Sequence, residues 1–334
     1  DWSSDVCSSD LATFRNTREN EMKKVLFATT ALIASAGIAS AQGVELSGSA
    51  EMGVVGGSGM ETQFWNDIDV TFTLSGETDN GLTFGATIDL DEIDAAGNGI
   101  PATSNPASVF LSGSFGTITM GDTDGAFDWA LTEVALAGGS IDDSETAHAG
   151  YNGNAGLDGS YDGQIARYDY SFGDFAFAVS VELDDSPANE TVLGLGGKYS
   201  ADLGGVDLGI GLGYQTDSAV GGDDIIGLSL TAGMGNGFSA GLNWSDLDNG
   251  DDHIGIGVAY TMDALTLAAN YGVYSFGTAG MADSEGFGLV ANYDLGGGAV
   301  VQFGYGTGKV DDTTLTNTRA ASINTWSLGV AMSF

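Results

Sequence analysis

Hydrophobic and polar residues alternate one by one along most of this chain. In residues 44–54, for example, Val44, Leu46 and Met52 lie at even positions, and Glu45 and Glu51 lie between them. A period of two is typical of a β-strand with one apolar and one polar face. The pattern predicts sixteen strands, at residues 44–54, 68–74, 82–90, 109–115, 117–121, 165–172, 175–183, 193–199, 208–216, 226–234, 238–246, 254–262, 265–274, 287–295, 299–305 and 324–334.

The connections between these strands fall into a short and a long class. The short ones are 115–116, 173–174, 236–237 and 263–264, and the long ones are 94–106, 126–164, 184–192, 217–224, 277–286 and 311–322. Tight turns at one rim and long loops at the other are typical of an antiparallel barrel in an outer membrane. Strands can cross lipid only in a closed barrel, because lipid offers no partner to backbone N–H and C=O groups.

The two faces of the strands differ in a way that favours lipid on one side and water on the other. The polar face carries mainly Gly, Ser, Thr, Asn and Asp, which suit a wet lumen. Large side chains occupy the apolar face, among them Tyr168, Tyr170, Phe172, Tyr199, Tyr214, Trp244, Tyr260, Tyr274, Tyr293 and Trp326. Tyr and Trp near strand ends suit a membrane interface, and the last strand ends on the aromatic Phe334.

We therefore expect an all-β fold, a 16-stranded antiparallel transmembrane β-barrel whose third long loop folds inward. About sixteen strands enclose a bore too wide for side chains to fill, so an aqueous channel is expected unless a loop narrows it. A secreted β-rich adhesin or β-solenoid is the alternative, since alternation alone also occurs in soluble β proteins.

The N-terminal segment does not share the strand pattern. Residues 1–21 have no period and no apolar core, and we interpret them as an upstream artefact. Residues 22–41 combine Lys23 and Lys24, an apolar run and the small residues Ala39-Ser40-Ala41, which together predict a signal peptide. The expected barrel is therefore residues 42–334, exported to the cell outer membrane.

Charge and residue usage exclude several functions. The formal net charge is −38, from 46 acidic and 8 basic residues, and the only basic residues after position 41 are Arg167, Lys198, Lys309 and Arg319. Nucleic-acid binding needs a basic face and is excluded, whereas nearby cations are favoured. The single cysteine, Cys7, lies in the excluded segment. Two histidines, His148 and His253, without a recognisable nucleophile motif argue against an enzyme.

The loop at residues 126–164 is the longest interruption of the strand pattern, and long insertions of this kind are usually functional. We expect its acids, together with two cations on the lumen-facing parity of the following strands, to form a pore constriction: Asp128, Glu133, Asp142, Asp143, Glu145, Asp158, Asp162, Arg167 and Lys198. A short helix or an apolar anchor is expected from Phe127, Trp129, Leu131, Val134 and Leu136, in which Trp129 and Leu136 hold the loop to the wall. Asp142, Asp143 and Glu145 form either a calcium site, because hard cations bind clustered oxygens, or a solvated acidic loop; no other cofactor is expected.

Several segments resemble those of a known family, namely 44–53, 74–85, 109–122, 292–298 and the terminal Phe334. They are similar to the general diffusion porins of alphaproteobacteria, of the Rhodobacter type. The resemblance implies a sixteen-stranded trimeric barrel in the outer membrane, and a third loop that bends inward as an eyelet. It also implies a basic cluster facing the acidic loop, and here only Arg167 and Lys198 are available on strands, which favours an acidic constriction.

The function that follows is passive diffusion of small hydrophilic solutes and ions, with a preference for cations set by carboxylates. Two alternatives remain at this level: a solute-specific outer-membrane channel, and a non-conducting surface adhesin or structural barrel. Open conductance separates a pore from a plugged barrel, and saturable block separates a specific channel from a general one.

Overall fold

The computed structural model describes residues 43–91, 107–161, 163–184, 186, 188, 190–278, 281–310 and 321–334. The predicted artefact and signal peptide, residues 1–41, lie outside these ranges, and so does Asp162 of the predicted constriction.

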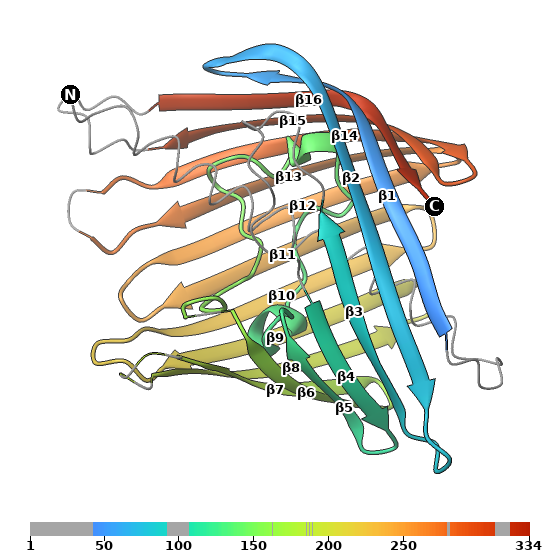
Figure 1. Ribbon diagram of the computed structural model, residues 1–334. Coiled ribbons are helices and arrows are strands. Elements are labelled where there is room, and N and C mark those ends of the chain that lie inside the picture. Colours follow the sequence, from blue (N-terminus) through green and yellow to red (C-terminus); the bar gives the residue numbers. More distant parts are fainter. Residues whose placement is uncertain are drawn as a thin grey trace. The chain divides into compact units, whose positions relative to one another are not determined.

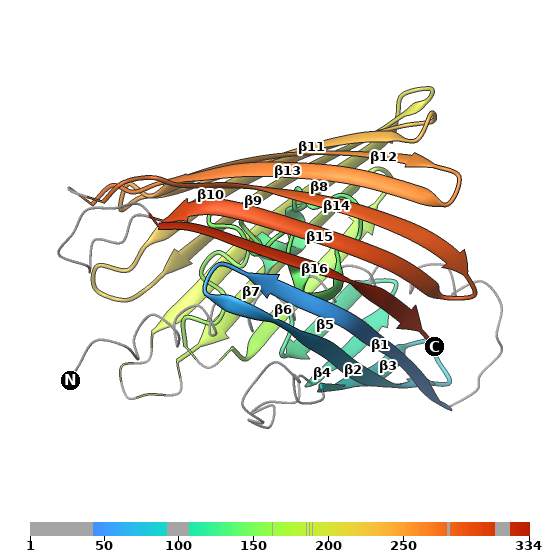
Figure 2. The same cartoon turned by 90° about the horizontal axis from the view of Figure 1, so that it is seen from above.

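Within the described residues, sixteen antiparallel strands close into one barrel, because β1 pairs with β2 on one side and with β16 on the other (Figures 1 and 2). The strands are β1 (Gly43–Gly57), β2 (Met60–Glu77), β3 (Thr83–Asp91), β4 (Ala107–Gly113), β5 (Gly116–Gly121), β6 (Ile165–Phe172), β7 (Phe175–Leu183), β8 (Thr191–Asp202), β9 (Val206–Asp217), β10 (Asp224–Met234), β11 (Phe238–Leu247), β12 (Asp252–Met262), β13 (Leu265–Ser275), β14 (Ser284–Gly296), β15 (Ala299–Val310) and β16 (Ala321–Ser333). The predicted fold class is confirmed. Each described strand pairs with its neighbours in sequence, and the β1–β16 pair joins the first strand to the last.

Where their connections are described, the two rims differ as the sequence predicts; the predicted long loops 94–106 and 311–322 lie wholly or largely outside the described residues. The connections at one rim, such as 114–115, 173–174 and 263–264, are tight turns. Connections at the other rim include the loop between β5 and β6, which contains the short helices α2 (Ala126–Ala130) and η1 (Ile141–Asp143). No helix within the described part of the chain is long and apolar enough to cross a bilayer.

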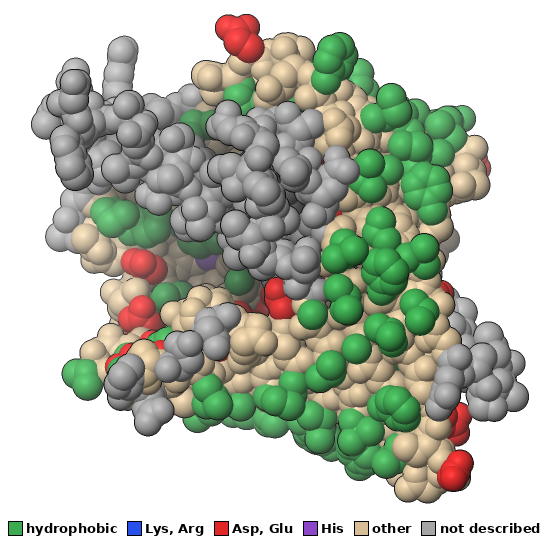
Figure 3. Space-filling model, in the orientation of Figure 1, with side chains coloured by type: hydrophobic (Ala, Val, Ile, Leu, Met, Phe, Trp, Pro, Cys, Tyr) green, Lys and Arg blue, Asp and Glu red, His purple; other side chains and the backbone are tan. Residues whose placement is uncertain are grey.

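Alternation along β2 shows how the wall separates two environments. Phe64 is 85% exposed and points outward, whereas its neighbour Trp65 is 3% exposed and points into the barrel. Large hydrophobic side chains are exposed in the same way around the outer face, and Figure 3 shows them spread over the outer face in view. An apolar surface this extensive marks contact with lipid rather than water.

The end of the chain completes the barrel. The backbone N–H of Phe334 donates to the carbonyl of Gly48 at 2.9 Å, next to the register pairs that join β1 and β16. The ring of Phe334 is 80% exposed. The terminal aromatic residue therefore helps to close the sheet through its backbone while its side chain stays on the outside.

Two details differ from the sequence prediction. β2 begins at Met60, eight residues before the predicted start at 68, because Trp65 places an apolar residue on the inward parity and hides the alternation. Tyr274 was expected on the outer face, but its hydroxyl donates to the carbonyl of Tyr151 inside the barrel at 3.2 Å. In β13 the outward residues Leu267 and Tyr271 have odd numbers, so Tyr274 has the inward parity.

Candidate functional site

The loop between β5 and β6 lies inside the barrel, against the inner wall (Figures 1 and 2). Its first arm, residues 122–139, leaves β5, passes β7–β12 and reaches β14. The η1 turn then contacts β1, β15 and β16. Its second arm, residues 144–164, returns past β14, β13 and β11 to β7 and β6. The loop is therefore a double layer on the wall, and most of its contacts join residues far apart in sequence.

Hydrophobic side chains at both ends of the first arm hold it in place. Phe127 and Leu131, buried at 1% and 7% exposure, pack against Ile225 of β10. At the turn, Ile141 is fully buried in a cluster with Val55 and Trp65 of β1 and β2. The loop tip thus packs against the first two strands, β1 and β2, whereas the loop base packs against β10. The sequence predicted an apolar anchor at Phe127 and Leu131 but missed Ile141, although its apolar character within an acidic loop was a usable signal.

Polar side chains of the wall bind the loop backbone along its whole course. In the first arm, the N–H groups of Ala126 and Thr132 donate to Ser180 at 2.8 Å and to Ser229 at 2.9 Å. Asn292 donates to the carbonyls of Ala137 and Gly139, at 3.1 and 2.8 Å. Because an unpaired buried backbone group is costly, these wall side chains make an irregular segment stable at this position.

The second arm is bound in the same way. The amide of Asn270 donates to the carbonyl of Glu145 at 3.2 Å, and the ring N–H of His253 donates to the carbonyl of Gly150 at 3.0 Å. Asn243 donates to Asn154 of the second arm at 2.6 Å and to the carbonyl of Thr132 in the first arm at 3.1 Å. This one side chain therefore joins both arms to β11.

Two carboxylates fix the ends of the loop. Glu182 of β7, only 2% exposed, accepts N–H groups from Gly159, Tyr161 and Gly163 at 3.0, 3.2 and 2.7 Å. Asp158 accepts the N–H of Gly125 at 2.8 Å and thereby ties the second arm to the start of the first.

Several of the predicted constriction acids are buried or hydrogen-bonded within the loop. Asp142 and Glu145 are 5% and 2% exposed, and the carboxylate of Glu145 accepts a hydrogen bond from Ser140. Glu133 accepts a hydrogen bond from the hydroxyl of Tyr151. In addition, Asp158 has the structural contacts described above, and Asp128 and Asp143 are half-buried. Their role in a constriction stays a prediction, but burial limits how far several of them can face the bore.

Burial raises the pKa of Glu145 above its ordinary value, because an apolar environment disfavours the charged form. The hydrogen bond from Ser140 acts in the opposite direction and is the smaller effect.

The calcium interpretation gains no support from the geometry. Among the residues that the structure describes, no three or more acidic, histidine or cysteine side chains are arranged to hold a metal ion, Asp142, Asp143 and Glu145 included. A calcium site needs six to eight oxygen ligands at close range. The three acids therefore do not fit that role as they stand.

The two cations lie together at the base of the loop. Arg167 donates to the carbonyl of Asp124 at 2.5 Å and pairs with Asp169 at 3.4 Å. The ammonium group of Lys198 lies 4.1 Å from the centre of the Trp129 ring, a cation–π contact. Trp129 thus contacts a wall residue, as expected of an anchor, and Leu136 lies beside Gly241 of β11. Both cations are engaged with residues at one corner of the bore.

The wall beyond the loop tip is acidic. The carboxylates on the inward parity of β1–β3 include Glu45, Glu51, Asp67, Asp69 and Asp89. Glu51 accepts the indole N–H of Trp65 at 3.3 Å, and Trp65 packs against Ile141 of the loop tip. Thr71 donates to Asp89 at 2.9 Å. The sequence pattern placed Glu45, Glu51, Asp69 and Asp89 on the polar face but did not include them in the constriction, and Asp67 lay outside the predicted strand at 68–74.

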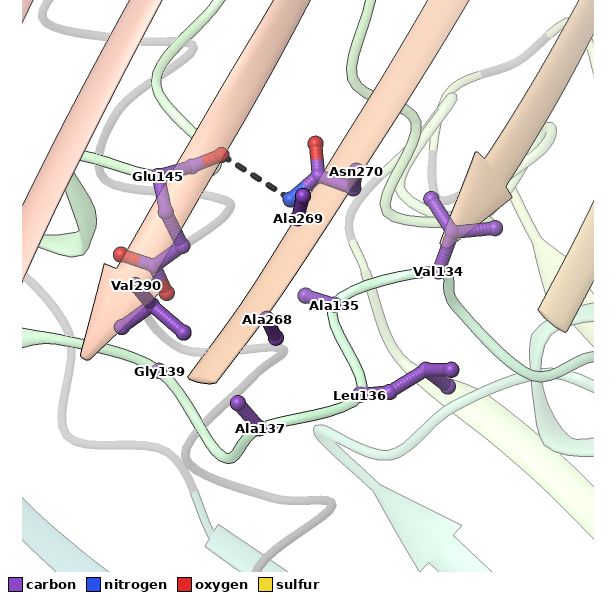
Figure 4. Close-up of a pocket in the computed structure, with 10 residues that line it drawn as sticks. All are labelled: Val134, Ala135, Leu136, Ala137, Gly139, Glu145, Ala268, Ala269, Asn270 and Val290. Carbon is purple, nitrogen blue, oxygen red and sulfur yellow. Dashed lines mark hydrogen bonds between the residues drawn. The ribbon is translucent and has the colours of Figure 1, made fainter. Parts of the chain in front are cut away.

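The loop fits the wall closely. Between residues 134–139 of the first arm, Glu145 and strands β13 and β14 lies a cavity of about 10 Å³ (Figure 4). This volume has room for about one water molecule. Figure 4 shows Val134, Leu136 and Glu145 of the loop around it, with Asn270 and Val290 of the wall. A ligand site of ordinary size is much larger, so this space is a packing gap.

Fold and site together define a passive channel, a closed barrel with a lipid-facing outside and one long loop seated inside. A family model for the Gram-negative porins matches residues 28–313, and the chain belongs to this family. A porin from Rhodobacter capsulatus is 30% identical over 307 residues, which make up 82% of this chain and 95% of that porin.

Two solved structures share the fold. A refined porin structure superposes with a TM-score of 0.67 at 24% sequence identity. A variant of the Rh. blastica porin superposes with a TM-score of 0.64 at 23% identity. In each case the match covers 87% of this chain and 100% of the other.

The protein is therefore a general diffusion porin of the Gram-negative outer membrane, a channel and not an enzyme. This confirms the family resemblance and the predicted location. It also decides against the non-conducting adhesin or structural barrel.

Proposed function

We propose that this porin prefers cations, and that the acidic wall of β1–β3 beside the loop tip is the main cause. The observation that carries the proposal is the position of Glu51, which lies on the inward parity next to Trp65, where the loop tip packs. From residue 25 to residue 166 the sequence has no Lys or Arg. The wall of β1–β3 therefore carries carboxylates, and none of its strands contributes a basic side chain.

A lumen lined by carboxylates raises the local concentration of cations and lowers that of anions. The loop acids Asp128 and Asp143 add to this effect where they face water. Arg167 and Lys198 oppose it, but both are held at the loop base by Asp124, Asp169 and Trp129. Exposed charges are screened over about 8 Å at physiological salt, so two cations at one corner do not reverse the field across the bore.

The test is the reversal potential of single channels in a planar bilayer under a KCl gradient. We expect a cation-directed potential, and a smaller one when Glu51→Gln and Asp89→Asn are combined, because the amides keep the hydrogen bonds from Trp65 and Thr71 but lose the charge. Asp79→Asn is the control. Asp79 lies at the exposed turn between β2 and β3, at the rim of the tight turns, and its substitution should leave the reversal potential unchanged. An anion-directed potential in the unaltered protein would refute the proposal and make Arg167 and Lys198 the dominant charges.

We also propose that the barrel assembles as a homotrimer. The support is the resemblance to the Rhodobacter-type porins, together with an apolar outer face that can be covered by lipid or by a neighbouring protomer. Mass measurement in detergent solution, by light scattering with correction for bound detergent, should give three copies of the chain. A mass of one copy would contradict the proposal.

A further inference from the structure

Six glycines of the inner wall lie directly beneath the backbone of the loop. At each of them a β-carbon would lie only 1.8–2.1 Å from a backbone carbonyl oxygen of the loop. We call this set the glycine track: Gly196, Gly211, Gly257, Gly272, Gly288 and Gly306, which face the carbonyls of Ala126, Ala130, Val134, Gly150, Glu145 and Ser144. The track includes one residue from each of β8, β9, β12, β13, β14 and β15.

Space, and not backbone conformation, explains these glycines. None of the six has a positive φ, so other residues could adopt the same backbone. Glycine in the middle of a strand weakens the strand, and it often marks a place where another backbone approaches closely. Here the approaching backbone belongs to the loop, and any residue with a β-carbon would occupy the space of a loop carbonyl group.

Hydrogen bonds fix the loop at this short distance. Asn270 binds the carbonyl of Glu145, which lies over Gly288, and Asn243 binds the carbonyl of Thr132 between the segments that cover Gly211 and Gly257. At the loop tip, the side chain of Ile141 lies over another glycine, Gly329 of β16. The loop is therefore held flat by wall amides and hydroxyls while the glycines remove the side chains that would stand beneath it.

We propose that the glycine track is the specificity-determining feature for solute size in this porin. By keeping the loop within backbone contact of the wall, the six glycines leave the rest of the bore open. A β-carbon needs about 3.0 Å from such an oxygen, so a methyl group in the track displaces the loop by about 1 Å toward the lumen. The inference rests on the channel activity of the family and is independent of the proposed cation preference.

The experiment compares three single substitutions in the full-length refolded porin. Gly257→Ala places a methyl group 2.0 Å from the carbonyl of Val134. Gly241→Ala meets only the flexible side chain of Leu136, at 3.3 Å. Gly233→Ala is the matched control: it is also an inward strand residue, near the end of β10, but the nearest atom to its β-carbon is the Cβ of Asp207 at 3.8 Å, on the wall itself.

Single-channel conductance and the swelling of liposomes in sugars of increasing size are the measurements. For Gly257→Ala we expect conductance to fall by roughly 1.5-fold, with larger sugars slowed more than small ones, because pore diameter sets both quantities. Gly241→Ala should give a smaller fall and Gly233→Ala none. The shift in gel mobility between heated and unheated samples checks that each barrel is folded.

Equal conductance in all three variants would overturn the proposal. So would higher conductance in Gly257→Ala, since that would mean the track only tethers the loop. If Gly257→Ala does not fold, Gly241→Val replaces it, because it presses on a side chain instead of on the backbone. Reversal potential is measured on the same channels, so a failure of the size argument can be distinguished from a failure of the cation preference.

Discussion

At the scale of single residues, Glu145 is a carboxylate that is almost completely removed from water. It is 2% exposed, is bound by Ser140, and lies between the loop and the wall of β13–β15. Its raised pKa means that the folded protein favours the protonated form. A group of this kind contributes stability that is fully present below its ordinary pKa and is lost as the pH rises through the raised one.

This gives a pH prediction with a defined sign. Glu145→Gln keeps an acceptor for Ser140 and cannot ionise, so it should match the unaltered porin in acid and be more stable at neutral and alkaline pH. The measurement is the apparent melting temperature in detergent from pH 4 to pH 9. Glu61→Gln, at an exposed position on the rim of β2, should give no such difference. A Glu145→Gln variant that is equally stable at every pH would contradict the prediction.

At the scale of elements, the loop depends on a few buried contacts that are far apart in sequence. Ile141→Ala removes the side chain that fills the cluster with Val55 and Trp65, and the cavity should weaken docking of the loop tip by about 2–5 kcal/mol. Loss of this contact releases the loop tip but leaves the rest of the loop bound to the wall. We therefore expect greater open-channel noise from motion of the tip, and faster amide exchange over residues 137–148.

Trp129→Ala is the informative comparison, because Trp129 was the anchor expected from sequence. It is half-buried under Lys198 near the loop base, where Phe127, Asp158 and Glu182 also hold the chain. We therefore expect a smaller change in noise than for Ile141→Ala. Val220→Ala, at a fully exposed position between β9 and β10, should have no effect. Equal noise in Ile141→Ala and Val220→Ala would show that the tip is held by hydrogen bonds alone.

The sequence predicts strands better than it predicts the seating of the loop, and the reason is physical. Lipid on one side and water on the other impose a period of two on every strand, so the barrel could be inferred from residues such as Val44 and Glu45. The place where the loop crosses the wall has no local signature. Parity shows that Gly257 points inward, but its partner is the carbonyl of Val134, more than a hundred residues away. Only the folded structure brings the two together.

At the scale of the whole molecule, the charge is distributed unevenly around the bore. The loop covers the wall of β7–β16, and Arg167 and Lys198 lie on strands beside the loop base. The inward face of β1–β3, in contrast, carries acids. The β1–β16 pairing places this acidic face next to the strands under the loop tip. A solute that passes the loop tip therefore meets carboxylates on the adjoining wall of β1–β3, which is a consequence of barrel closure and not of any local sequence motif.

The glycine track also limits how this pore can evolve. Glycine is the smallest residue, so every substitution in the track adds volume beneath the loop and none can remove it. Single mutations there can make the outer membrane less permeable to a toxic solute such as a hydrophilic antibiotic, but they cannot make it more permeable. A wider channel would require a shorter loop, which needs a deletion. A narrower channel, which excludes the toxic solute, needs only one substitution and is therefore more accessible to evolution.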